Sequence, residues 1–206
     1  MSEAKKEKIQ MDPKYLFKLA GILMVICAVV AALLGVVNSV TADKIKAIQE
    51  QKLQASLQVV FPGAEFTKVD VTDELSALAA SPNAESGLEA IYEASTGGYA
   101  VEVTPTGFGG AIDMIVGIDA DGNVTGVSVI SHAETAGIGT KIVADKPNKN
   151  GVGVLTQFIG RGAGEGNLFT VNSGSNEVDA ISGATVTTKA VTRGVNAASL
   201  VAEQLG

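Results

Sequence analysis

The feature that most constrains this chain is an uninterrupted apolar run near its N-terminus. Residues 19–37 read LAGILMVICAVVAALLGVV, nineteen residues without a charge or a proline. A helix of this length spans about 30 Å, close to the thickness of the hydrocarbon core of a bilayer. We therefore expect one transmembrane helix over residues 19–38. The alternative is a cleaved signal peptide ending near Val40-Thr41-Ala42. The apolar core of a signal peptide usually has only about 7 to 15 residues, which favours a retained anchor.

The lysines on either side of this run predict its orientation. Five lysines lie within residues 1–18, and three follow the run within residues 44–52. Cytoplasmic flanks of membrane helices carry the excess of Lys and Arg. We expect residues 1–18 to form a cytoplasmic tail and the chain beyond the helix to lie outside the cytoplasmic membrane, as a single-pass protein of the cell (inner) membrane.

Charge and cysteine content exclude several classes of function. The net charge is −7; residues 1–18 carry five lysines and three acidic residues, a net of +2, so the remainder carries −9. An acidic domain of this kind lacks the clustered basic residues that bind nucleic acid. Cys27 is the only cysteine and His132 the only histidine. These exclude an internal disulfide and make a thiol cluster, a zinc site or triad chemistry improbable.

The rest of the chain predicts an α+β fold in two parts. Residues 39–86 should form a membrane-exit helix, stopped by Pro62-Gly63, and a connecting segment in which residues 70–86 are a loop or a short helix. Residues 87–206 should form the main domain. Gly97-Gly98 and residues 119–122 are hairpin turns between alternating runs, which indicates a twisted antiparallel sheet. A short amphipathic helix is expected over residues 152–160 and a longer one over residues 183–205, so that helices flank the sheet.

The stretch from Asp179 to Lys189 reads DAISGATVTTK and gathers hydroxyl groups where the last helix is expected to begin. The first amides of a helix have no intrahelical partner and attract anions, so the hydroxyls Ser182, Thr185, Thr187 and Thr188 suggest a phosphate site. The spacing alone favours the alternative, in which Ser182 is a simple N-cap and the threonines are surface residues.

A second loop, residues 131–141, combines His132 and Glu134 with Thr135, Thr140 and two glycines. His132 and Glu134 offer fewer ligands than the three or four that a zinc site uses. Gly137 and Gly139 would let a flat ligand approach the backbone closely. The alternative is a turn at the end of a strand that holds a hydrogen-bonded histidine.

Four separated segments together resemble one family. They are residues 61–64 (FPGA), 107–110 (GFGG), 132–139 (HAETAGIG) and 179–185 (DAISGAT). This combination closely resembles the FMN-binding domain of the G subunit of the Rnf ion-translocating electron-transport complex. The C subunit of the sodium-translocating NADH:quinone reductase shares the domain but is usually longer. One departure is Ala136, where relatives commonly carry proline.

The resemblance implies that FMN is joined through its phosphate to Thr185, with Thr187 as the second choice, and that a flavin transferase attaches it from FAD. Ser182, Gly183 and Ala184 would then surround the phosphate, with Asp179 just upstream. Two glycine-rich loops, residues 107–110 and 132–141, would supply walls around the flavin ring. Their candidate contacts are Gly109, Gly110, His132, Glu134, Thr135, Gly137, Gly139 and Thr140.

The resemblance also implies a function. The chain would be an electron-transfer subunit of a membrane-bound ferredoxin:NAD oxidoreductase that translocates ions, without complete catalytic activity alone. Its partners would be other membrane and redox subunits, especially a second flavinylated membrane subunit. The flavin supplies the redox chemistry, and the protein tunes it. A stand-alone extracytoplasmic flavoprotein, the C subunit of a sodium-translocating NADH:quinone reductase, and a non-redox adhesion or assembly domain are the alternatives.

Overall fold

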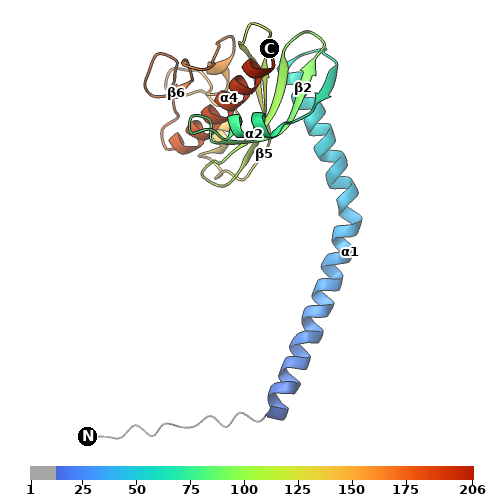
Figure 1. Cartoon of the computed structure of the whole chain (residues 1–206). Helices are drawn as coiled ribbons and strands as arrows, with labels where there is room; N and C mark the ends of the chain where they lie inside the picture. The colour runs from blue at the N-terminus through green and yellow to red at the C-terminus, as the bar shows by residue number, and fades with distance from the viewer. Residues whose placement is uncertain (1–12) are drawn as a thin grey trace, which may run out of the picture. The chain divides into compact units, whose positions relative to one another are not determined.

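The computed structural model describes residues 13–206, and the chain divides into two compact units, Met1–Ile48 and Gln49–Gly206. Helix α1 (Pro13–Val60) begins in the first unit and ends in the second (Figure 1). The predicted transmembrane segment and the predicted membrane-exit helix both lie within α1, so they form one continuous helix. Among the described residues, α1 is the one helix long and apolar enough to cross a membrane. The predicted cytoplasmic tail lies mostly outside the described residues.

The second unit is built on a five-stranded antiparallel sheet in the order β1-β2-β3-β4-β5. The strands are β1 (Phe66–Val69), β2 (Ser86–Ala94), β3 (Tyr99–Pro105), β4 (Ile112–Ile118) and β5 (Val124–His132). Both predicted hairpins are confirmed. Gly97 and Gly98 turn β2 into β3 with φ of 93° and 96°, a conformation that costs glycine little. The side chain of Asp119 fixes the next turn, since its Oδ1 accepts from the amides of Asp121 and Asn123.

Helix α4 (Thr185–Leu205) covers one face of the sheet. Its inward side chains and those of β3 and β4 form the larger apolar core, including Val101, Met114 and Val195. Gly194 allows the close approach, because a Cβ there would lie 2.9 Å from Cγ of Pro105. This packing fixes the start of α4 in space, as the sequence pattern predicted.

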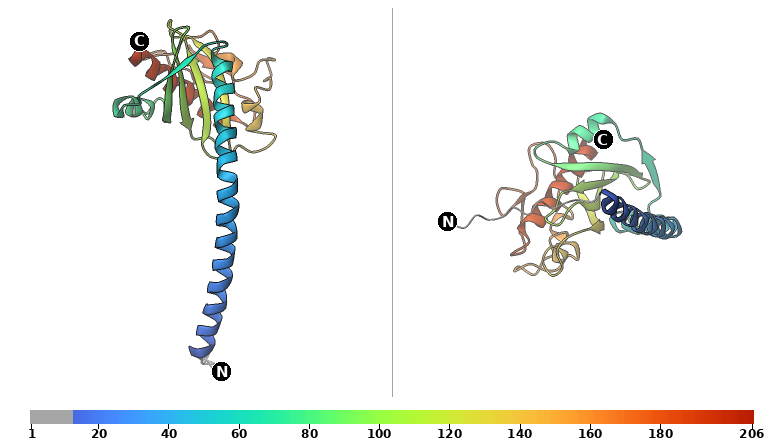
Figure 2. Two further views of the ribbon diagram at one scale, coloured as in Figure 1. Left: turned by 90° about the vertical axis from the view of Figure 1, so that its right-hand side faces the viewer. Right: turned by 90° about the horizontal axis from the view of Figure 1, so that it is seen from below.

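The last turns of α1, within the second unit, cover part of the other face of the sheet (Figure 2). Leu57, Val60 and Phe61 pack there in a smaller apolar cluster with Ile115. Gly117 makes room for the helix, because a Cβ at that position would lie 2.8 Å from Cβ of Val60. The glycine in β4 is therefore a packing requirement rather than a weak point in the strand.

The remaining elements are short. They are α2 (Asp73–Ala79), α3 (Thr140–Val143), the 3₁₀ helix η1 (Thr156–Phe158), and the parallel pair β6 (Thr170–Val171) and β7 (Glu177–Val178). The connecting segment thus contains a short helix, α2, whose N-cap Thr72 accepts from the amide of Leu75. The helix expected over residues 152–160 is only η1. Strand β1 was not predicted, and the compact unit begins at Gln49, well before residue 87.

Candidate functional site

The candidate site lies where two glycine-containing loops meet the first turn of α4. The first loop, residues 107–110, is closed by the bridge between Thr106 and Ala111 and by a 2.7 Å hydrogen bond from Gly107 N to Gly110 O. The second follows β5 and ends at α3. A cavity of 170 Å³ lies between these segments. Its lining residues are Phe108, Glu134, Thr135, Ile138, Gly139, Gly183, Ala184, Val186 and Thr187.

Glu134 connects all three segments. Its side chain is buried, with 7% of the residue exposed. One carboxylate oxygen accepts from Gly109 N at 3.0 Å, and the other accepts from Thr187 Oγ1 at 2.5 Å. A Cβ at Gly107 or Gly139 would overlap these carboxylate oxygens. The glycines are therefore needed to bring both loops against a buried charge, which is stable only when it is hydrogen-bonded.

The first turn of α4 leaves its amides available. Ala184 is the N-cap, and no side chain makes a capping hydrogen bond there. The possibility that Ser182 is a simple N-cap is therefore wrong. Gly183, with φ of 82°, turns the chain into the helix. The uncapped amides and the positive end of the helix dipole favour an anion at this position.

The three threonines of this turn differ in their environments. Thr187 and Thr188 are buried, with 2% and 0% exposed. Their hydroxyls donate to Glu134 and to the carbonyl of Ala184, respectively. Thr185 is partly exposed, and its hydroxyl makes no hydrogen bond within residues 13–206. Of the three, only Thr185 is partly exposed and has a hydroxyl without a hydrogen-bond partner among residues 13–206.

The structure brings many of the predicted site residues together. Glu134, Thr135, Gly139, Gly183 and Ala184 line the cavity. Several others lie in the segments that surround it: Gly109, Gly110, Gly137, Thr140, Ser182 and Thr185. Thr140 acts within its own loop, where its Oγ1 accepts from Gly137 N at 2.9 Å.

Eight of the thirteen predicted site residues, including Thr185, are not among the residues that line the cavity, and two of these eight, His132 and Asp179, make hydrogen bonds to other parts of the chain. His132 is exposed at the end of β5, and its Nδ1 accepts from Glu134 N at 3.2 Å. Asp179 accepts from the side-chain amide of Asn150 at 2.7 Å, and its backbone pairs with the side chain of Gln157. Both residues hold neighbouring chain segments in place in this structure.

The sequence reasoning missed the apolar rim of the cavity. Phe108, Ile138 and Val186 line it and remain 71%, 48% and 51% exposed. A signal was present in the sequence, because Phe108 is a large apolar residue between two glycines. Large apolar side chains exposed around one opening are typical of a surface that binds a ligand or partner.

A second group of carboxyls lies on the sheet, away from this site. Burial, then the nearby charges of Asp113 and Glu89, raise the pKa of Glu102 to about 7. Burial also raises the pKa of Asp113, and the charge of Glu89 adds to the effect. With both groups ionised, Asp113 Oδ1 is buried without a hydrogen-bond donor among the described residues. A protonated Glu102 can donate a side-chain hydrogen bond to Asp113.

Together, the fold and the site define a class, an α+β domain with a ligand cavity at the start of a helix, on a chain that has one candidate membrane helix. A sequence model of the FMN-binding domain matches residues 107–199, and one of the RnfG N-terminal region matches residues 11–60. The chain belongs to the G subunits of Rnf-type ion-translocating oxidoreductase complexes. It is therefore an electron-transfer subunit of a multisubunit redox enzyme and carries FMN.

Relatives with known assignments cover nearly the whole chain. The G subunit of the Na⁺-translocating ferredoxin:NAD⁺ oxidoreductase complex of Acetobacterium woodii is 38% identical, over 97% of this chain and 98% of the relative. The G subunits of ion-translocating oxidoreductase complexes from Shewanella baltica and Cereibacter sphaeroides are 31% and 33% identical. These alignments cover 85% and 84% of this chain, and 84% and 78% of the relatives.

Proposed function

We propose that this protein carries its FMN as a phosphoester of Thr185. The observation that carries the proposal is the difference among the three threonines at the start of α4. Thr187 and Thr188 are buried and their hydroxyls already donate hydrogen bonds, whereas the hydroxyl of Thr185 is free. In the attachment reaction the Thr185 oxygen would displace AMP from FAD and give up its proton, under the action of a flavin transferase.

The helix start suits the remaining charge of such a linkage. A phosphodiester keeps one negative charge, and the uncapped amides of α4 can stabilise it by about 0.3–1 kcal/mol at a surface position. The described residues that line the cavity include no Lys or Arg. The helix amides are therefore the donors proposed to hold the phosphate, with Ser182, Gly183 and Ala184 beside them.

The cavity volume indicates how much of the cofactor the site encloses. At 170 Å³ it is smaller than the roughly 300–1,000 Å³ of pockets that enclose a drug-sized ligand. We propose that the flavin ring extends over the apolar rim of Phe108, Ile138 and Val186, and that the loop residues Thr135 and Gly139 lie beside it. A ring held in this way stays accessible to another redox centre, as an electron carrier requires.

Within the complex, we propose that the flavin passes electrons between neighbouring redox subunits, including a second flavinylated membrane subunit. The Acetobacterium woodii relative supports a ferredoxin:NAD⁺ oxidoreductase of the ion-translocating type. The lysine-rich residues 1–18 support a cytoplasmic N-terminus and an extracytoplasmic flavin domain. Neither ferredoxin nor NAD would then bind this chain directly, because both reactions take place on the other side of the membrane.

The experiment that tests the tether is flavinylation of isosteric variants. The full chain is produced with a flavin transferase, denatured and inspected for flavin fluorescence on a gel. Thr185→Val should abolish the signal and Thr185→Ser should retain it. Thr188→Val should remain fluorescent, and Thr187→Val should remain fluorescent at a reduced level, because it loses the hydrogen bond to Glu134. Fluorescence that survives in Thr185→Val would show that the assignment is wrong.

Peptide mapping then locates the bond. Trypsin should release residues 162–189, which contain all three threonines, as one fragment. Fragmentation should place the added FMN on Thr185, and its placement on Thr187 would favour the second choice. For the orientation, a protease applied to intact cytoplasmic-membrane vesicles of known sidedness should cleave the flavin domain only when the extracytoplasmic face is outward.

A further inference from the structure

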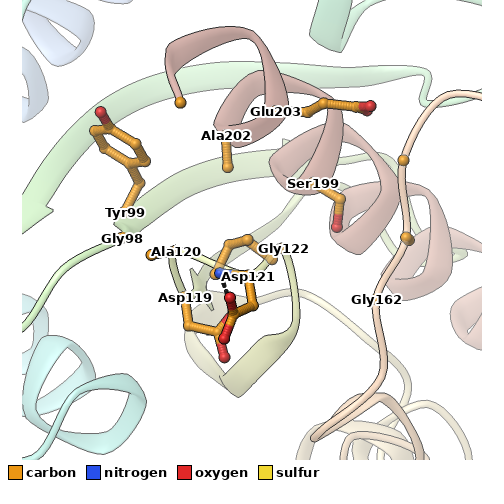
Figure 3. A pocket seen from close by; sticks show the side chains of 14 residues that line it. Gly98, Tyr99, Asp119, Ala120, Asp121, Gly122, Gly162, Ser199, Ala202 and Glu203 are labelled. Carbon is orange, nitrogen blue, oxygen red and sulfur yellow. Dashed lines mark hydrogen bonds between the residues drawn. The ribbon is translucent and has the colours of Figure 1, made fainter.

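A second cavity lies at the opposite end of α4 from Thr185, between the β4–β5 turn and the last turns of the helix. Figure 3 shows the side chains that line it. Its volume is 560 Å³, within the roughly 300–1,000 Å³ range of small-molecule sites. Thr185 and Ser199 are fourteen helical residues apart, about 21 Å along the axis, so this cavity is separate from the flavin site. Most of its lining is Gly or Ala, and these small residues leave the space open.

All formal side-chain charges on this lining are negative. Asp119 and Asp121 come from the β4–β5 turn and Glu203 from the last turn of α4. None of the described lining residues is Lys, Arg or His. The C-terminal end of α4 adds partial negative charge through its carbonyls. The electrostatic potential of the cavity therefore selects for a cation.

The carboxylates differ in how far they are already engaged. Asp119 Oδ1 accepts from two amides of its own turn, and Glu203 accepts from Glu165 N at 2.9 Å. The carboxylate of Asp121 is exposed and accepts no hydrogen bond from the described residues. Asp121 is therefore the side chain most available to a ligand.

Ser199 provides an independent sign that the cavity takes a ligand. Only 1% of this residue is exposed, and its Oγ has no hydrogen-bond partner in the described part of the chain. Figure 3 shows the hydroxyl pointing from α4 toward the β4–β5 turn. A buried hydroxyl without a partner is unfavourable, because it has lost its hydrogen bonds to water. Because it has lone pairs, this hydroxyl can accept a hydrogen bond from a cationic N–H group.

We propose that this cavity binds an organic cation through an ammonium or guanidinium group. Asp121 supplies the principal charge, Ser199 Oγ accepts a hydrogen bond, and Asp119 and Glu203 add to the potential. Tyr99, whose hydroxyl donates to Leu205 O, lines the cavity with an aromatic ring. A metal ion fits less well, because no group of three or more His, Cys, Asp or Glu within residues 13–206 is placed to hold one. The cation is either a free small molecule or a Lys or Arg side chain of a neighbouring subunit.

Titration of the full-length flavinylated protein with agmatine, which carries both cationic groups, tests the proposal. The protein is placed in nanodiscs of phosphatidylcholine and binding is followed by calorimetry. We expect one site that weakens as salt rises. Asp121→Asn should weaken binding about fivefold, as expected for loss of an exposed ion pair, and Asp70→Asn should have no effect. Ser199→Ala should also weaken binding without lowering the melting temperature, because it removes an unpaired buried hydroxyl.

The assembled complex distinguishes the two sources of the cation. If a neighbouring subunit fills the cavity with a side chain, agmatine binds the isolated chain but not the complex, and Asp121→Asn lowers the yield of complex. If the ligand is a free molecule, agmatine binds both with equal affinity. Absence of agmatine binding to the isolated chain overturns the proposal. Equal weakening by Asp70→Asn and Asp121→Asn overturns it as well, since that result would reflect net charge alone.

Discussion

Glu134 and Glu102 are both carboxyl groups withdrawn from water in the same domain, but their neighbours differ. Glu134 faces hydrogen-bond donors, Gly109 N and Thr187 Oγ1, and joins three segments of the candidate site. Glu102 lies near the acidic residues Asp113 and Glu89, and burial, then these nearby charges, raise its pKa to about 7. The difference shows that burial alone does not decide what a carboxyl group does. Donors make Glu134 a structural connection, whereas burial together with nearby like charges makes Glu102 a proton-binding group.

The largest expected effect is the loss of the Glu134 contacts. Glu134→Ala leaves Gly109 N and Thr187 Oγ1 without partners, and we expect the free energy of unfolding to fall by about 3 kcal/mol. Flavin incorporation should fall as well, because both loops lose their connection to α4. Chemical denaturation in detergent and in-gel fluorescence measure the two effects.

An exposed carboxylate serves as the control for this variant. Glu65→Ala should leave the stability and the flavin content nearly unchanged, since surface substitutions away from specific contacts have small effects. Equal stability of Glu134→Ala and the wild-type protein would contradict the connecting role of Glu134.

An intermediate effect is expected from crowding Glu134 without removing it. Gly139→Ala places a Cβ 2.8 Å from Cβ of Glu134, and overpacking of this kind costs about 1–3 kcal/mol. Gly137→Ala is the matched control. Its Cβ would meet nothing within 4 Å, and the positive φ of 76° should cost about 1 kcal/mol.

Flavin incorporation separates the two glycine variants better than stability does. Gly139→Ala should lower it, because the Cβ displaces a carboxylate that lines the cavity. Gly137→Ala should leave it close to that of the wild-type protein. If both variants incorporate flavin equally, the close approach at Gly139 does not shape the site.

The smallest expected effect is a gain in stability rather than a loss, and it comes from replacing Glu102. Its folded-state pKa of about 7 lies above the ordinary value of 4.5, so the folded state holds the proton more tightly than the unfolded state. Ionisation therefore lowers stability as pH rises between these values. Glu102→Gln should remove this contribution and stabilise the protein at pH 8 by about 1 kcal/mol or less, after allowance for solvent screening.

Denaturation of both proteins between pH 4.5 and pH 8 gives the difference directly. The two stability curves should lie closest at the acidic end and separate as pH rises toward 8. A wild-type curve that rises relative to Glu102→Gln over this range would contradict the raised pKa.

Local patterns predicted much of the fold. The apolar run at residues 19–37 predicted the anchor, and Gly97-Gly98 and Asp121-Gly122 predicted the hairpins, because turn geometry depends on a few adjacent residues. Strand β1 is only four residues long and its burial does not alternate, so it carried no periodic signal. The continuity of α1 was also missed, since a change from apolar to amphipathic sequence does not by itself end a helix.

The candidate site was predicted less completely. Its three segments were identified, but the role of Glu134 depends on contacts with Gly109 and Thr187, residues 25 and 53 positions away. No local pattern specifies such contacts. The apolar character of Val186 was visible, yet its position at the rim depends on how α4 packs on the sheet.

The burial of Thr187 and Thr188 has a consequence for the order of maturation. In an unfolded chain, the threonines within residues 185–188 present similar hydroxyls to a transferase, and the choice among them would be poor. Folding removes two of these hydroxyls from competition, so under the proposed tether the acceptor is selected by tertiary structure. Attachment of FMN should then take place after folding. Chains exposed to the transferase while denatured should carry either no flavin or flavin distributed over several threonines.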